Sequence, residues 1–239
     1  MTDFAFLTTL GFGPGGWGPA MLTAAAMTIA VALAGFAFGA VIGVCGAWAK
    51  LSGGVALRAA ADAYTTVLRG IPDLLVIYLF YFGSSAVLTP IGRFFGATGF
   101  ISLPGFLAGA LAIGVVSGAY HTEVFRGAYR NVARGEIEAA LATGMSRPLM
   151  FRRIVAPLVL RYALPGLGNV WQLVLKESAL ISVTGLVEIM RQAQIGSGST
   201  RQPFTFFFAA AILYLLISSV SGWLLGRSEQ HFTRGMRRV

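Results

Sequence analysis

The residues whose types and spacing indicate chemistry are concentrated in residues 135–157, the longest charged and polar interruption in a mostly apolar chain. A short helix is expected over residues 136–143, with an acid in its first turn, where the helix dipole favours negative charge. Gly144 is suited to end that helix in left-handed geometry, and Pro148 is suited to begin a second short helix. That second helix carries two bases, Arg152 and Arg153. Two small helices joined at a glycine form a compact element of the kind that docks against a partner.

This stretch also resembles a known motif. Glu138-Ala139-Ala140, three residues, Gly144, nine residues, Ile154, two residues and Pro157 are similar to the EAA motif in the cytoplasmic coupling loop of ABC-importer permeases. The resemblance implies a coupling loop, residues 127–157, that sits in a groove of an ATP-hydrolysing subunit. The residues it assigns to that contact are Glu138, Ala139, Ala140, Gly144, Ile154 and Pro157.

A second group of ionisable residues lies at or near membrane depth, where charge is costly and often functional. Glu177 and Glu188 are candidates for facing a cationic substrate group, and Lys176 for meeting a carboxylate. The alternative is that these side chains pair with one another or hold an outer gate. Both interpretations stay open at this point.

Arg69-Gly70-Ile71-Pro72 predicts a helix disturbance, because Pro72 removes a backbone donor. It is either an interfacial kink anchored by Arg69 or part of a gate or subunit contact, which would make Arg69, Pro72 and Asp73 pathway residues. With Asp73-Leu74-Leu75 after it, the tetrapeptide resembles the polar amino-acid branch of these permeases.

Most of the chain resembles this same polar amino-acid branch. Residues 118–127, residues 161–166 and Leu175-Lys176 are similar to permeases for histidine, lysine, arginine, ornithine or related opines. The chain has Ser178-Ala179-Leu180 where the common acceptor sequence has Thr-Ser-Leu, so residue-level transfer is weakest there.

Other possible sites have simpler explanations. His121 and Glu123 lack nearby partner ligands in the sequence, so a structural role at the membrane edge is favoured over a proton relay or metal site. Gly11, Gly13 and Gly16 match the spacing of a dinucleotide fingerprint, but no strand precedes them and Pro14 interrupts them. The chain has no Gly-x-x-x-x-Gly-Lys-Ser/Thr loop, so it is not expected to hydrolyse ATP or to bind a cofactor or metal.

The elements that must position these residues are hydrophobic helices. With 56% hydrophobic and 11% charged residues in 239, the composition is that of an all-α integral membrane protein. We expect a single permease domain over residues 1–239, with five spans at about 21–48, 59–88, 104–123, 158–176 and 203–226. In the first span, Gly35, Gly39 and Gly43 recur every four residues, which predicts close helix packing.

The basic residues then predict the orientation. The formal charge of +9 would suggest nucleic acid in a soluble protein, but here it orients the spans. With the N-terminus outside and the C-terminus cytoplasmic, thirteen basic residues lie inside and three (Arg93, Arg191 and Arg201) outside, with Arg161 and Lys176 at membrane edges. The coupling loop is therefore cytoplasmic.

The resemblance implies partners: a homologous second permease chain, two ATP-binding subunits that hold ATP and Mg²⁺, and an extracytoplasmic substrate-binding protein, in a bacterial inner membrane. The alternative is an ion-coupled secondary transporter or channel that is complete in itself. That class usually needs ionisable residues deep in several spans and more than five helices, which this sequence does not provide.

Overall fold

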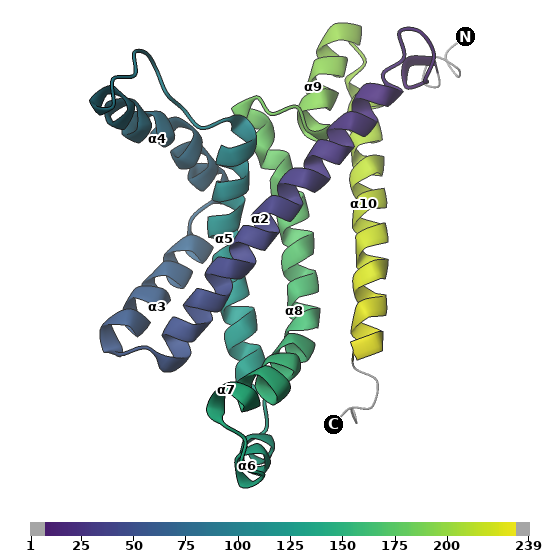
Figure 1. Ribbon diagram of the computed structural model, residues 1–239. Helices are drawn as coiled ribbons and strands as arrows, with labels where there is room; N and C mark the ends of the chain where they lie inside the picture. The colour runs from purple at the N-terminus through teal and green to yellow at the C-terminus, as the bar shows by residue number, and fades with distance from the viewer. Residues whose placement is uncertain (1–7, 233–239) are drawn as a thin grey trace. The chain divides into compact units, whose positions relative to one another are not determined.

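The computed structural model describes residues 8–232, and within them the only regular elements are helices (Figure 1). The N-terminal segment before Thr8 and the arginines Arg234, Arg237 and Arg238, which the orientation prediction used, lie outside the described residues. In order, the helices are α2 (Gly18–Ser52), α3 (Val55–Gly70), α4 (Asp73–Phe94), α5 (Gly105–Arg130), α6 (Arg134–Ala142), α7 (Arg147–Met150), the π-helix η1 (Phe151–Val155), α8 (Ala156–Glu177), the 3₁₀-helix η2 (Ser178–Thr184), α9 (Ile189–Thr200) and α10 (Pro203–Phe232).

Five helical stretches in the described chain are long and apolar enough to cross a membrane. They are Gly18–Ser52, Asp73–Phe94, Gly105–Arg130, Arg147–Thr184 and Pro203–Phe232. The expected all-α fold with five spans is confirmed. The helices extend beyond most of the expected spans because their ends carry polar turns that a hydropathy criterion leaves out.

One expected span is two helices. Residues 59–88 were expected to form a single span, but α3 ends at Gly70 and α4 begins at Asp73. Between them Ile71 (φ −103°, ψ 150°) and Pro72 (φ −62°, ψ 131°) are extended. Proline disfavours helical geometry in the residue before it, so the chain leaves the helix there and restarts at Asp73. The disturbance predicted at Pro72 is thus a complete break.

The residue contacts divide the chain into two compact units, which are described separately. Unit 1 comprises Met1–Gly35, Pro72–Ile113 and Val174–Val220. Its core surrounds Phe206 on α10, which packs with Met21, Ile189 and Ala193 and receives the edge of Trp17 at a ring distance of 5.4 Å. In Figure 1, α9 lies beside the first turns of α10.

Unit 2 comprises Phe36–Ile71, Gly114–Leu173 and Ser221–Val239. Here α2 and α5 pack closely, because Gly39 lies against Ser117 and Gly43 against His121. A Cβ at either glycine would collide with the facing helix. The close packing predicted from the glycine stripe is confirmed, including Gly35, which meets Ile113 within unit 1.

Candidate functional site

The candidate site is a groove between two helical walls. The first wall is α6, which contains the Glu138-Ala139-Ala140 motif. Glu136 stands in the first turn, as the helix dipole favours. The helix ends in a Schellman motif: Met145 N–H donates to the carbonyl of Ala140 at 3.2 Å, and Gly144 N–H to that of Leu141 at 3.0 Å. Gly144 has a φ of +77°, so the predicted left-handed turn is confirmed.

The second wall is formed by η1 and the start of α8. A short helix was expected from Pro148, and α7 begins one residue earlier, at Arg147, with Ser146 as its N-cap. It does not end as a separate helix, however: α7, η1 and α8 follow one another without a break. No helix breaker stands between Pro148 and Pro157. Since Pro157 has no N–H to donate back, the preceding residues, which include Arg152 and Arg153, widen into a π-turn.

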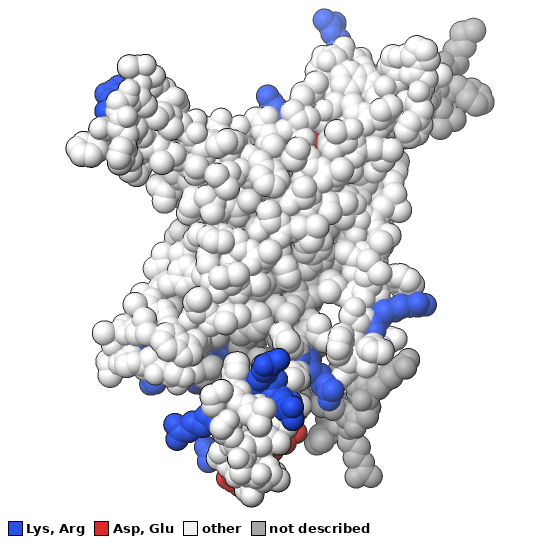
Figure 2. Space-filling model, in the orientation of Figure 1, with Lys and Arg blue, Asp and Glu red and all other residues white. Residues whose placement is uncertain are grey.

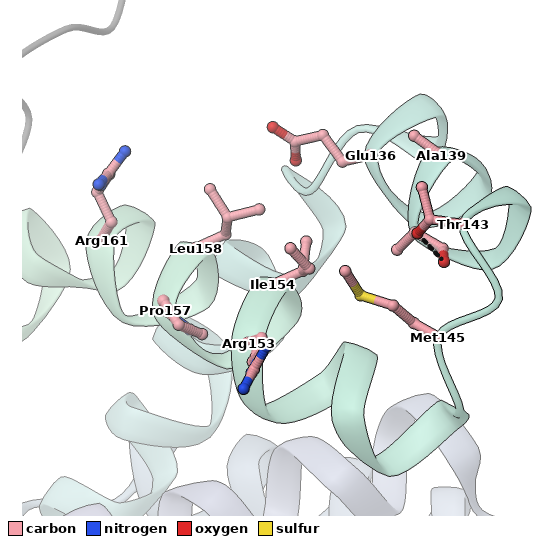
Figure 3. A pocket seen from close by; sticks show the side chains of 10 residues that line it. Glu136, Ala139, Thr143, Met145, Arg153, Ile154, Pro157, Leu158 and Arg161 are labelled. Carbon is pink, nitrogen blue, oxygen red and sulfur yellow. Dashed lines mark hydrogen bonds between the residues drawn. The ribbon is translucent and has the colours of Figure 1, made fainter.

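The two walls enclose a groove of about 510 Å³ (Figure 3). Each wall contributes side chains at helical spacing i, i+3, i+4 and i+7. The lining residues are Glu136, Ala139, Ala140 and Thr143 from the first wall, Ile154, Pro157, Leu158 and Arg161 from the second, and Met145 and Arg153. Figure 3 shows Met145 and Ile154 directed toward the space between the walls, with Glu136 and Arg161 on opposite sides of it.

The surface around the groove combines apolar and charged side chains. Leu141 is 49% exposed, and Leu149 and Phe151 are also exposed. Figure 2 shows Lys and Arg side chains gathered around this end of unit 2, with acidic side chains among them. Exposed large apolar residues rimmed by charge are typical of protein interaction surfaces.

Four of the six residues predicted for ATPase contact lie together in this groove: Ala139, Ala140, Ile154 and Pro157. Glu138 is exposed outside it, and Gly144 forms the turn that folds the walls together. Sequence reasoning missed Glu136, Thr143, Leu158 and Arg161 as lining residues. Their helical spacing from the motif residues was a usable signal, since positions three and four apart share a face.

In unit 1, Asp73 and Glu177 come together. Asp73 is the first residue of α4 and is partly buried, and Glu177, at the end of α8, is only 4% exposed. Their carboxyl groups interact with each other, and neither forms an ion pair within the described chain. Lys176 is exposed beside them in sequence. A positive charge placed beside two neighbouring carboxyl groups would be favoured electrostatically.

The other expected pathway residues have visible structural contacts. In unit 2, the guanidinium of Arg69 lies over the ring of Tyr120, 5.3 Å from its centroid. Pro72 is the N-cap residue of α4 in unit 1. Both positions fit the break between α3 and α4.

Glu188 caps α9. Its carboxylate accepts the N–H groups of Met190 at 2.9 Å and Arg191 at 2.7 Å, and the hydroxyl of Tyr214 at 2.9 Å. Burial raises the pKa of Glu188, and these three hydrogen bonds oppose that rise. All of these contacts are structural, and they lie within unit 1.

His121 and Glu123 are also held by structural contacts, in unit 2. The buried ring of His121 bonds through Nδ1 to the carbonyl of Ser117 at 2.8 Å and lies against Phe36. Glu123 binds Lys50 at 2.7 Å and Arg126 at 2.9 Å. The described residues contain no group of three or more His, Cys, Asp or Glu side chains placed to hold a metal ion.

Comparison with known proteins agrees with this geometry. The chain is 64% identical over 229 residues to the octopine transport system permease protein OccQ of Agrobacterium tumefaciens strain Ach5, covering 96% of this chain and 97% of that one. It is 49% identical to the nopaline transport system permease protein NocQ of Agrobacterium fabrum strain C58, covering 97% and 98% of the two chains. It is 37% identical to the histidine/lysine/arginine/ornithine transport system permease protein HisQ of Escherichia coli K12, covering 94% and 98%.

A solved structure, an amino acid ABC transporter with histidines, matches with a TM-score of 0.76 at 29% identity, covering 90% of this chain and 95% of that one. Residues 35–234 match the family described as binding-protein-dependent transport system inner membrane component. These matches, together with the five apolar helices and the EAA motif on the groove, place the chain in one class of transporter. The chain belongs to the family of binding-protein-dependent transport system inner membrane components, the permease subunits of ABC importers.

Proposed function

We propose that this permease subunit forms half of the translocation pathway of an ATP-driven importer for opines or basic amino acids. The observation that carries the proposal is the groove between α6 and the start of α8, built around the EAA motif. A partner ATPase docks against this groove. The ATPase binds ATP and Mg²⁺ and hydrolyses the nucleotide. This chain itself performs no hydrolysis.

Coupling runs through Glu138, Ala139, Ala140, Gly144, Ile154 and Pro157. The small side chain of Ala139 permits close approach of the partner, and exposed Glu138 meets basic or amide groups on it. Gly144 holds α6 against the second wall through the Schellman motif. Because η1 and α8 continue directly from that wall, movement of the loop on ATP binding is transmitted along α8.

The substrate class follows from charge. Asp73 and Glu177 offer two neighbouring carboxyl groups to a cation, which suits the guanidinium or ammonium group of a basic amino acid or opine. The relatives named for octopine, nopaline and histidine/lysine/arginine/ornithine transport share that chemistry. Arg69, Pro72, Lys176 and Glu188 shape or support the pathway without a proposed direct contact.

The assembly contains a homologous second permease chain, two ATP-binding subunits and an extracytoplasmic substrate-binding protein. It lies in the bacterial inner membrane, with the N-terminus outside and the coupling loop and C-terminus in the cytoplasm. The excess of basic residues in the loops assigned to the inside supports this orientation.

Co-purification of the tagged chain from its native membrane tests the assembly. We expect a P-loop ATPase and a second permease to be recovered with it, and ATPase activity in proteoliposomes to rise when the loaded binding protein is added. Glu138→Lys should abolish both recovery and stimulation while membrane insertion is unchanged. Gln230→Lys, which also introduces a lysine at an exposed position but outside the loop, should change neither.

Substrate is tested by uptake of labelled octopine, arginine and a neutral amino acid. Glu177→Gln should reduce uptake of the cationic compounds while the ATPase still co-purifies. Recovery of the chain alone, with transport in vesicles without ATP, would instead establish a secondary carrier and overturn the proposal.

A further inference from the structure

A second pocket lies within unit 2, away from the coupling groove. It has a volume of about 270 Å³ and is lined by the ends of α2, α3 and α5. Its lining residues are all charged: Lys50, Arg58, Asp62, Glu123, Arg126 and Arg130. Four positive and two negative side chains leave a formal charge of +2.

The two acids are already neutralised inside this pocket. Lys50, whose side chain is 6% exposed, binds both Asp62 and Glu123 at 2.7 Å. Arg126 binds the other oxygen of Glu123 through Nε at 2.9 Å. The surplus positive charge therefore belongs to Arg58 and Arg130.

Arg58 and Arg130 are both exposed, and neither forms an ion pair within the described chain. Two guanidinium groups at the mouth of one pocket are suited to an anion with several acceptor oxygens, such as a phosphate group. The pocket has room for such a group together with water.

The surroundings favour a lipid over a soluble anion. Lys50 lies in the last turn of α2 and Arg130 in the last turn of α5, both helices long and apolar enough to cross a membrane. Near the same helix ends Trp48, Val55 and Leu57 are exposed, and Val55 is 89% exposed. Apolar side chains beside a basic pocket at the ends of membrane helices suit acyl chains below a charged headgroup.

We propose that this pocket binds the phosphodiester headgroup of an anionic phospholipid, with Arg58 and Arg130 as its ligands. Lys50 and Arg126 pair with the two acids, Asp62 and Glu123, so that these carboxylates do not repel the headgroup. The proposal rests on unit 2 alone and does not depend on which substrate the permease transports.

For the test, the full chain is placed in nanodiscs of phosphatidylcholine with or without phosphatidylglycerol. The lipid that it retains is then measured by native mass spectrometry in a neutral detergent. The wild-type chain should retain phosphatidylglycerol. The double variant Arg58→Gln/Arg130→Gln should bind it roughly thirtyfold more weakly, as expected for the loss of two interfacial arginines. Because both side chains are exposed and unpaired, the unfolding temperature in lipid-free detergent should be unchanged.

Arg93→Gln/Arg201→Gln is the matched control, since it removes two exposed arginines elsewhere. It should leave lipid retention unchanged. An equal loss of retention in the control would show that the effect comes from general surface charge, and it would overturn the proposal. Displacement of the lipid by inorganic phosphate at comparable concentration would indicate a free-phosphate site and also overturn it. Loss of ATPase co-purification in the Arg58/Arg130 variant with unchanged lipid retention would assign the pocket to a protein contact instead.

Discussion

The ammonium group of Lys50 donates to the carboxylate of Glu123 at 2.7 Å, although the two residues lie 73 positions apart. The same ammonium group binds Asp62 at 2.7 Å and the hydroxyl of Thr65 at 2.6 Å. One buried cation thus fastens α3 and α5 to the end of α2 within unit 2. Such a charge is tolerated only because all of its donors are directed at acceptors.

We predict that Lys50→Met destabilises the folded chain by about 2 kcal/mol, because it removes one of the two cations that bind the partly buried carboxylate of Glu123. Glu123 keeps Arg126, and Asp62 is exposed enough to be solvated, so the chain should still fold. The measurement is unfolding in neutral detergent, by temperature and by denaturant.

Two further variants make this prediction specific. Arg58→Met removes a base that lines the same pocket without an ion pair, and it should change stability by less than about 0.5 kcal/mol. Lys50→Met/Glu123→Gln should be less destabilised than the two single changes together, by about 1 kcal/mol or more. Strict additivity would show that the two side chains are not coupled.

Whether a contact in this chain could be predicted from the sequence depends on how far apart its residues lie in the sequence. The Gly144 turn was predictable because a helix, a glycine and a resumed helix are local features. Helical spacing could group the residues of each wall, but it could not show that the two walls share one groove, since Ala140 and Ile154 come together only after the chain folds back at that turn. The Lys50–Glu123 contact was likewise out of reach, because nothing within either segment specifies a partner 73 positions away.

Gly144→Ala should weaken the coupling loop through the backbone. Gly144 has open space around it but a φ of +77°, so a methyl group costs about 1 kcal/mol through conformation and not through a clash. Uptake and ATPase co-purification should both fall. Gly135→Ala is the control: Gly135 lies in the first turn of α6, has equally open space and has no positive φ, so the change should be neutral or slightly stabilising. Equal losses in the two variants would contradict the role of the Schellman turn.

Tyr214→Phe should destabilise unit 1 by about 1.5 kcal/mol, because it removes a hydrogen bond to the buried carboxylate of Glu188. Thermal unfolding measures the change. Tyr78→Phe, at an exposed tyrosine on α4 with no hydrogen bond within the described chain, is the matched control and should change little. A similar loss in both variants would point to ring packing instead of the hydrogen bond.

The same site predicts a pH dependence. Burial raises the pKa of Glu188 above its ordinary value, so the folded state holds that proton more tightly than the unfolded state. The contribution of Glu188 to stability should therefore fall as pH rises from the ordinary glutamate pKa to the folded one, and stay constant above both. Glu188→Gln should remove this slope in unfolding temperature against pH. A slope that persists unchanged in the variant would assign it to another group.

The capping role of Glu188 also shows a limit of pattern reading. N-caps are usually Ser, Thr, Asp or Asn, so a glutamate at the start of α9 gave no capping signal. Its position near membrane depth instead made it a candidate for a substrate contact, with pairing or an outer gate as the alternative. The hydroxyl of Tyr214, 26 positions further on, joins the N–H groups of Met190 and Arg191 in satisfying its charge.

Gly196 and Gly198 allow a test of packing within one helix. A Cβ at Gly196 would collide with the ring of Phe206, the centre of the unit 1 core, whereas Gly198 has no atom within 4 Å of that position. Gly196→Ala should therefore cost about 1–3 kcal/mol by overpacking, while Gly198→Ala should stabilise α9 by up to about 1 kcal/mol through helix propensity. Unfolding of the two variants in detergent should shift in opposite directions. If both stabilised the chain, the ring of Phe206 would have to move aside freely, and the packing of α9 against α10 would be looser than its contacts indicate.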